Sequence, residues 1–256
     1  MIKKQLITCS VISLLLVISG FSVSARVHKP KPKKVNKINA GYRFIFTEKN
    51  LADDPSFADE PIPVNDAHID HKLRHSVFSI SHTKTETMIL QREAASLFPI
   101  IEPILKMYGI PDDFKYIPLV EAGLKSGVSK RGAAGWWQFM PGTARTYGLK
   151  VGNGRDDRYS IRKSTVAACK YIKELYAEFN SWTLAAAAYN NGEIQLARAI
   201  RNQSEDNYFR LHLNRETGVY VYRIIAMKKI VEQPQQLGFK YYCNTNLQPA
   251  ELVVNN

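Results

Sequence analysis

The sequence predicts an all-α domain that follows an extended, mostly irregular N-terminal arm. After Asn65, apolar residues recur at spacings of three and four through most of the chain, which is the pattern of helices with one buried face. Gly, Pro and Ser residues stand where these stretches begin and end. The earlier part is rich in Lys, Pro and Asp and has little periodicity. An apolar content of 45% and a charged content of 23% are ordinary for a globular domain.

Residues 1–25 are predicted to form a cleaved signal peptide. Lys3 and Lys4 precede a mostly apolar run from Leu6 to Phe21, and Val23-Ser24-Ala25 offers small residues for cleavage. The run is shorter than the about 20 apolar residues that a spanning helix needs, so a retained membrane anchor is the less favoured alternative. We therefore expect export to the periplasm or cell envelope.

Residues 26–65 are predicted to form a linker arm with a basic and then an acidic part. The chain has a formal charge of +12, and six basic residues without an acid lie between Arg26 and Lys37. No aromatic interleaving or recognition helix accompanies them, so a nucleic-acid partner is not expected. An anionic envelope polymer or a membrane surface fits this charge equally well, and we expect a monomer. Tyr42–Phe46 alternates and is interpreted as a short strand or a docking peptide.

Residues 66–232 are predicted to be the helical domain and residues 233–256 a tail, in which Leu237–Asn256 has weak strand signals. An apolar helical face strengthens after Thr85, and Pro99 is expected to break this helix. A second helix is expected over Ile100–Met107, closed by Gly109. Pro111 is expected to begin the next helix, because proline is favourable in a first turn.

Serine residues are expected to cap two helices in the second half of the chain. Ser160 precedes a helix predicted to end at Phe179, and Ser181 precedes one predicted to end at Asn190. A short helix is predicted at residues 143–147, and further helices are predicted over residues 193–201, 205–211 and 216–231.

Two cysteines remain after the predicted signal peptide. Cys169 falls on an apolar stripe with helical spacing, which predicts a side chain that faces the core. A Cys169–Cys243 disulfide is the alternative, because exported proteins meet oxidising conditions. Neither cysteine has neighbouring histidine pairs, so no metal site is predicted, and no cofactor is expected.

Glu121 is the first candidate for a functional residue. Phe114, Ile117 and Glu121 are spaced by three and four, so the acid shares the apolar face of its helix. A carboxyl group in that setting is disfavoured in its charged form, so its pKa should rise. A raised pKa suits a general acid near neutral pH. Periodicity alone, however, favours a glutamate at a helix end that reaches solvent.

Two further segments place polar residues among apolar ones. Gln138 lies within Trp136-Trp137-Gln138-Phe139-Met140, which is either a core plug or a sugar-stacking shelf with one hydrogen-bonding amide. Ala185–Ala188 allows close helix packing and delivers Tyr189 and Asn190 at a helix end. Taken alone, such residues are more often packing or capping residues than catalysts.

Four ordered motifs together resemble the lytic transglycosylase (SLT) domain family. The likeness spans roughly Asp66 to Val231. The motifs are Pro118-Leu119-Val120-Glu121-Ala122-Gly123, Gly132-Ala133-Ala134-Gly135-Trp136-Trp137-Gln138-Phe139-Met140-Pro141, Ala188-Tyr189-Asn190-Asn191-Gly192 and Glu216-Thr217-Gly218-Val219-Tyr220-Val221.

The resemblance implies a lysozyme-like helical fold that cleaves the β-1,4 linkage between N-acetylmuramic acid (MurNAc) and N-acetylglucosamine (GlcNAc) in peptidoglycan strands. Glu121 would be the single catalytic acid. It would protonate the glycosidic oxygen and then take the proton of the C6 hydroxyl, which closes a 1,6-anhydro ring without water. Gln138 and Tyr189 would line the cleft, with the tyrosine hydrogen-bonding near the acid. The resemblance also implies substrate contacts from the other motif residues, Met140, Asn190, Glu216 and Tyr220.

Two alternatives to this function remain open at this point. Ordinary glycosidases pair two carboxylates across the scissile bond, and Glu216 is the only other acid in the four motifs. A hydrolytic muramidase of the same fold is therefore the first alternative. The second is a non-catalytic wall-binding or scaffolding protein, because Ala122 stands where the family usually has serine.

Overall fold

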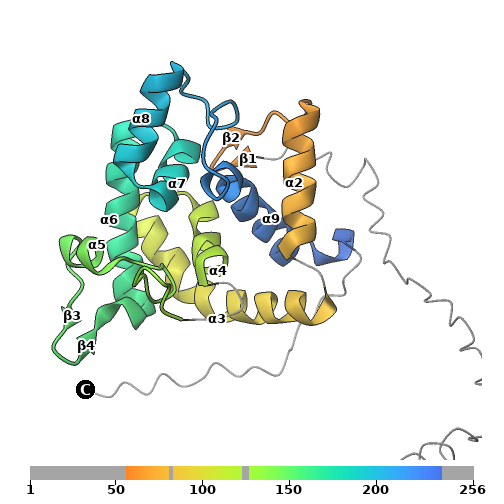
Figure 1. Cartoon of the computed structure of the whole chain (residues 1–256). Coiled ribbons are helices and arrows are strands. Elements are labelled where there is room, and N and C mark those ends of the chain that lie inside the picture. Colours follow the sequence, from red (N-terminus) through yellow and green to blue (C-terminus); the bar gives the residue numbers. More distant parts are fainter. Residues whose placement is uncertain (1–55, 81–82, 123–126, 238–256) are drawn as a thin grey trace, which may run out of the picture. The chain divides into compact units, whose positions relative to one another are not determined.

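The structure is a computed structural model and describes residues 56–80, 83–122 and 127–237. These residues belong to one compact unit of packed helices with two small hairpins (Figure 1), so the predicted all-α class is confirmed. The expected signal peptide, the segment Tyr42–Phe46, most of the C-terminal tail and Cys243 lie outside the described residues. Within the described ranges, no helix combines the length and hydropathy that crossing a membrane requires.

The elements follow one another in an order dominated by helices. The α-helices are α2 (Ala67–Ile80), α3 (Lys84–Tyr108), α4 (Ile117–Ala122), α5 (Pro141–Thr146), α6 (Ile161–Phe179), α7 (Trp182–Asn191), α8 (Glu193–Gln203) and α9 (Tyr220–Glu232). Short 3-10 helices are η2 (Asp112–Tyr116), η3 (Asp157–Tyr159), η4 (Thr217–Val219) and η5 (Pro234–Leu237). Strands β1 (Ser56–Phe57) and β2 (Glu60–Pro61) form one antiparallel hairpin, and β3 (Val151–Gly152) and β4 (Arg155–Asp156) form the other.

The predicted break at Pro99 is wrong, because α3 continues through both Pro99 and Pro103. Both prolines are exposed, so water can satisfy the carbonyl groups that lose their helical donors. Leu97, Ile101 and Leu105 meanwhile keep one buried stripe on the opposite side. Burial of that stripe outweighs the local cost of the prolines. The predicted end at Gly109 is confirmed, and Gly109 adopts a left-handed φ of 67°.

The segment after Pro111 begins as a 3-10 helix and becomes the α-helix α4 at Ile117. Pro118 lies in the first turn of α4, a position that proline tolerates well. Phe114 and Ile117 are fully buried, as their spacing predicted.

The predicted serine caps of α6 and α7 are confirmed, whereas one predicted helix is absent. The Oγ atoms of Ser160 and Ser181 accept hydrogen bonds from the backbone N–H groups of Lys163 and Leu184 at the starts of α6 and α7. The helix predicted over residues 205–211 is absent from the described structure. There the side chain of Asn207 accepts from Phe209 N at 2.9 Å, and this local turn competes with helix formation.

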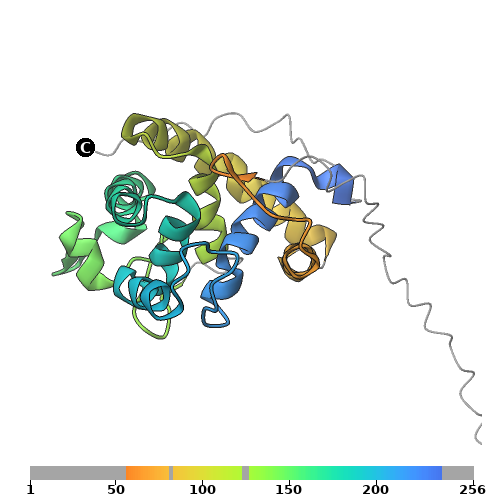
Figure 2. The same cartoon turned by 90° about the horizontal axis from the view of Figure 1, so that it is seen from above.

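The core gathers around α6, α7 and α9. Ala185–Ala188 of α7 are fully buried, and α7 packs against both α6 and α9. Cys169 of α6 is a free, fully buried thiol, and burial raises its pKa to about 12, which confirms that it faces the core. Helix α9 packs against α2 and also against α4 and α7 (Figures 1 and 2).

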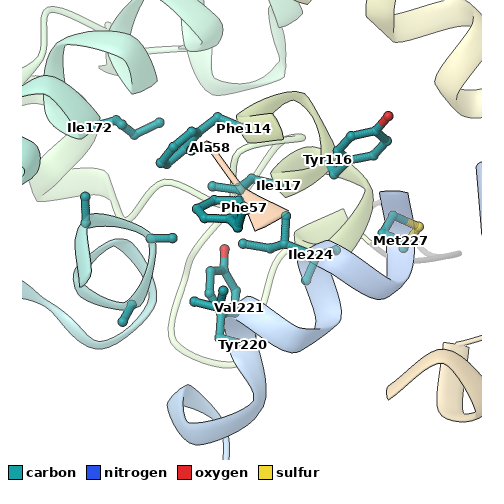
Figure 3. Packing of buried hydrophobic residues seen from close by; sticks show 14 of the residues in the cluster. Phe57, Ala58, Phe114, Tyr116, Ile117, Ile172, Tyr220, Val221, Ile224 and Met227 are labelled. Carbon is teal, nitrogen blue, oxygen red and sulfur yellow. The ribbon is translucent and has the colours of Figure 1, made fainter. Parts of the chain in front are cut away.

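The hairpin β1–β2 is integrated into this core. Phe57 is only 1% exposed, and its ring lies 5.2 Å from that of Phe114. Figure 3 shows Phe57 among Ile117 of α4 and Val221 and Ile224 of α9. The last part of the predicted arm, residues 56–62, therefore packs within the domain and connects η2, α7 and α9.

Candidate active site

Glu121 is delivered to the site by the short helix α4. Its side chain is half-buried, on the same face as the fully buried Phe114 and Ile117. The hydroxyl of Tyr220, at the start of α9, donates a hydrogen bond to Glu121 Oε1 at 2.5 Å. The structure thus brings together an acid and a tyrosine that lie 99 positions apart in the chain.

The environment of Glu121 favours its protonated form. Burial is the main cause and raises the pKa of its carboxyl group above the ordinary value of 4.5, and the nearby charge of Glu216 raises it further. The Tyr220 hydrogen bond and the positive charge of Arg223 lower the pKa, but burial prevails. A carboxyl group that keeps its proton at higher pH can act as a general acid.

Two tyrosines near Glu121 stay protonated as hydrogen-bond donors. Burial and the charge of Glu121 raise the pKa values of Tyr189 and Tyr220 well above the ordinary range. The Tyr189 hydroxyl donates to the backbone carbonyl of Trp137 at 2.7 Å. The resemblance implies that Tyr189 hydrogen-bonds near the acid, and in the structure the direct hydrogen bond to Glu121 comes from Tyr220. Tyr189 instead joins the end of α7 to the loop that carries Gln138.

That loop, Gly135–Met140, is held by a tight turn and by Arg158. Gln138 N donates to Gly135 O at 3.1 Å, and Gly135 has a φ of 76°. A Cβ atom on Gly135 would lie 2.0 Å from the carbonyl oxygen of Arg158, so only glycine fits there. The Arg158 guanidinium donates to the carbonyl oxygens of Gly132 and Phe139.

The large side chains of this loop lie partly in the core and partly at the surface. Trp137 is fully buried, and its indole N–H donates to Thr165 Oγ1 at 2.9 Å. Phe139 is also buried, Trp136 is half-buried and Met140 is 41% exposed. Two of the four large side chains, Trp137 and Phe139, therefore pack in the core, and Met140 is exposed.

Gln138 adopts a left-handed φ of 46° between these apolar residues. Its side-chain NH₂ donates to the carbonyl oxygens of Gly127 at 3.2 Å and Gly135 at 2.8 Å. The amide nitrogen thus holds the loop together. The amide oxygen is the part of Gln138 that can accept from a substrate hydroxyl or N–H group.

Asn190 and Glu216 form a second polar group that joins α7 to the start of η4. Asn190 Nδ2 donates to Glu216 Oε1 at 3.1 Å, and Thr217 Oγ1 donates to Asn190 Oδ1 at 2.8 Å. Asn214 contacts Thr217 and accepts from its backbone N–H. The Glu216 side chain is exposed, yet its charge acts on Glu121. This carboxylate therefore influences the acid electrostatically.

Three residues that act on the site or hold its supporting elements were not predicted from the sequence. Arg223 follows Tyr220 by three positions on α9 and acts on Glu121 through its charge. Arg158 positions the Gln138 loop. Glu60 accepts hydrogen bonds from Trp182 N and from Thr183 N, and so caps α7. Arg223 could have been predicted from its position three residues after Tyr220, because residues three apart share one face of a helix. No local sequence pattern indicated the contacts of Arg158 and Glu60.

Taken together, the arrangement supplies one partly buried, protonatable carboxyl group among hydrogen-bond donors and acceptors. Such a group can protonate a leaving oxygen and later accept a proton. Ala122, beside it, is buried. Across the described ranges, no group of three or more His, Cys, Asp or Glu residues is arranged to hold a metal ion.

Comparison with known proteins agrees with this geometry. The sequence profile of the transglycosylase SLT domain matches residues 99–211. Membrane-bound lytic murein transglycosylase D from Escherichia coli (strain K12) is 34% identical over 143 residues, which are 53% of this chain and 31% of that protein. The protein of the same name from Escherichia coli O6:H1 gives the same values. The chain thus spans about a third of the length of these relatives.

The matched profile includes Glu121, Gln138, Met140, Tyr189 and Asn190 but ends before Glu216 and Tyr220. Those last two residues join the site through the contacts of Tyr220 with Glu121 and of Glu216 with Asn190. Residues 99–211 of this helical domain are therefore similar to the transglycosylase SLT domain, and Glu121 lies inside the matched part.

Proposed function

We propose that the protein is a peptidoglycan lytic transglycosylase that cleaves the MurNAc–GlcNAc β-1,4 linkage and leaves 1,6-anhydro-MurNAc ends. The SLT domain and the murein transglycosylase relatives support this activity. The observation that carries the proposal is Glu121, a half-buried carboxyl group with a raised pKa and a hydrogen bond from Tyr220.

In the proposed reaction, Glu121 acts first as an acid and then as a base. Its proton passes to the glycosidic oxygen as the bond from that oxygen to C1 of MurNAc breaks, and GlcNAc leaves with a free hydroxyl group. The Glu121 carboxylate then takes the proton of the C6 hydroxyl while O6 bonds to C1. The proton returns to Glu121 and no water is consumed, so one residue can serve both steps.

The other site residues are proposed to bind the glycan strand. The Gln138 amide oxygen and the Asn190–Glu216 pair can offer polar contacts, and the exposed Met140 can offer an apolar one. Tyr189 and Tyr220 are proposed to orient this region, because their hydroxyls hold the loop carbonyl and the acid. A peptidoglycan substrate fits an exported protein of the periplasm or cell envelope.

Digestion of purified peptidoglycan with the full chain tests the proposal. Mass spectrometry of the fragments should find anhydro-muramic ends, each lighter by one water than a reducing end. Glu121→Gln should lower the rate about 10²- to 10⁴-fold, the usual loss on removing a general acid. Glu178→Gln, an exposed change on α6, should leave the rate unchanged. Wild-type protein that releases no fragments would contradict the activity and favour a scaffolding role.

Hydrolysis is the second candidate function, and Glu216 is the observation that favours it. Its charge acts on Glu121, and a second carboxylate near an acid can activate water in an inverting glycosidase. Hydrated, reducing muramic ends from the wild-type protein, lost in Glu216→Gln, would support this candidate. Anhydro ends that persist in Glu216→Gln would leave Glu216 with a substrate-binding role.

A further inference from the structure

Arg223 lies on the face of α9 that presents Tyr220 to the site. Residues three apart on a helix are neighbours on one face, and the Tyr220 hydroxyl bonds directly to Glu121. Most of α9 around it is buried, including Tyr222, Ile224 and Ile225, whereas Arg223 is half-buried. Arg223 is therefore a half-buried residue on the face of α9 that carries Tyr220.

The positive charge of Arg223 reaches both partners of the central hydrogen bond. It lowers the pKa of Glu121 and also that of Tyr220. Arg223 thus follows Tyr220 by three positions on α9 and acts electrostatically on the Tyr220–Glu121 pair.

Several buried or partly buried cations of the domain contact carboxylates, whereas no ion pair among the described residues includes Arg223. Lys115 contacts Glu102 and Asp112, Arg158 contacts Asp156, and Lys228 contacts Asp113. Among the residues that the structure describes, no hydrogen bond or ion pair involves the Arg223 side chain. A half-buried guanidinium without an anion leaves five donors available to a ligand.

The acids of the site do not pair with the Arg223 guanidinium. Burial keeps Glu121 inclined to its neutral form, and Glu216 is engaged by Asn190. A guanidinium matches a carboxylate in shape and charge, and can bind it through two parallel hydrogen bonds. The chemistry of this position therefore calls for a carboxylate from the substrate.

We propose that Arg223 binds the lactyl carboxylate of the muramic acid residue beside the scissile bond. The proposal rests on the proposed function and deepens it. In strands without stem peptides the lactyl carboxyl is free and charged, whereas in strands with stems it is an amide. The site would then act preferentially on stem-free glycan strands.

The test compares two substrates prepared from the same stem-free strands. One keeps its lactyl carboxylate, and in the other this group is reduced to the alcohol. We expect the full-length wild-type chain to show a kcat/KM about 10- to 100-fold higher on the carboxylate form, as for loss of a charge-assisted hydrogen bond. For Arg223→Gln the ratio should fall to about one. Arg223→Lys should keep part of it, and Arg201→Gln on the exposed surface of α8 should keep all of it.

A role for Arg223 in tuning Glu121 alone would give a different result. The groups around the acid are Glu216, Tyr189, Tyr220 and Arg223, and loss of the arginine charge raises the pKa of Glu121. If Arg223→Gln moved the alkaline limb of the pH profile upward but slowed both substrates equally, the proposal would be wrong.

The wild-type protein and the end groups provide two further tests. Wild-type protein that cleaves both substrates equally, or that prefers strands with stems, overturns it without any variant, so a poorly folded Arg223→Gln does not block the test. The end groups are read in the same digests. Anhydro ends without discrimination contradict only the role of Arg223, whereas absent anhydro ends contradict the proposed function.

Discussion

Glu121 shows how opposing influences on one residue set its chemistry. Burial and the charge of Glu216 raise the pKa of its carboxyl group, while Tyr220 and Arg223 lower it. A general acid loses activity as the pH rises through its pKa. Each neighbour therefore has a predicted direction of effect on the alkaline limb of the pH–rate profile.

We expect Tyr220→Phe to move that alkaline limb to higher pH. The Tyr220 hydrogen bond stabilises the Glu121 carboxylate, so its removal raises the pKa of the acid further. The rate at the optimum should fall about 10-fold, as for the loss of one hydrogen bond to a charged group. Rates on peptidoglycan across pH provide the measurement.

Tyr222→Phe is the matched control on the same helix. The Tyr222 hydroxyl is buried without a hydrogen-bond partner in the described structure, so its removal should leave the alkaline limb in place. The assignment of Tyr220 as the partner of Glu121 fails if Tyr220→Phe also leaves the limb unchanged.

We also expect Glu121→Gln to stabilise the fold at neutral and higher pH. Folding raises the pKa of Glu121, so the buried carboxylate costs stability above its folded-state pKa. Below the unfolded-state value of about 4.5, both states are protonated and the gain should vanish. Denaturant unfolding at several pH values measures this difference. A gain that is independent of pH, or a gain from the exposed Glu178→Gln, would count against this account.

At the scale of elements, the loop Gly135–Met140 is positioned by segments that follow it in the chain. Arg158 holds the carbonyl oxygens of Gly132 and Phe139, and Tyr189 holds that of Trp137. The loop has little regular secondary structure, apart from one isolated bridge between Ala134 and Phe139. Its geometry therefore depends on these contacts and on Gly135.

Gly135→Ala should destabilise the domain by about 3 kcal/mol and lower kcat/KM. The added methyl group would meet the Arg158 carbonyl oxygen at 2.0 Å, and backbone has to move to relieve such overlap. Gly142→Ala is the control, since nothing lies within 4 Å of a Cβ atom there. It should change the unfolding free energy by less than about 1 kcal/mol. Equal effects of the two changes, measured by urea unfolding, would refute this account.

At the scale of the whole molecule, the hairpin β1–β2 connects parts of the domain that are distant in sequence. Phe57 is buried against Phe114, and Ala58 N donates to Asp113 Oδ2 at 2.8 Å. Glu60 accepts from Thr183 N at 2.9 Å across 123 positions. The hairpin thus supports both the segment before α4 and the start of α7, and these two helices carry Glu121 and Tyr189.

Removal of residues 1–65 should therefore lower the melting temperature far more than removal of residues 1–50. The longer deletion removes the buried Phe57, and replacing a buried phenylalanine by alanine alone costs about 3–5 kcal/mol. Thermal unfolding of both truncated chains gives the comparison. If the longer deletion does not fold, Glu60→Ala in the full chain should still cost about 1–2 kcal/mol as a lost helix cap. Equal melting temperatures would show that the hairpin is dispensable.

Much of the fold was predictable because its signals are local. The serine caps of α6 and α7, the glycine end of α3 and the buried stripe with Cys169 all agree with the structure. The break at Pro99 and the helix over residues 205–211 were wrong. In the first case distant packing outweighed a local cost, and in the second an asparagine side chain offered the backbone a competing turn.

The sequence by itself determined the helical class, the helix faces and the order of the motifs around Glu121, because helix periodicity and capping act within a few residues. Only the tertiary structure decided that Tyr220 donates a hydrogen bond to Glu121, that the charge of Arg223 acts on this pair and that Glu60 caps α7. These contacts join segments about a hundred positions apart. Their geometry follows from how the helices pack, which no local pattern records.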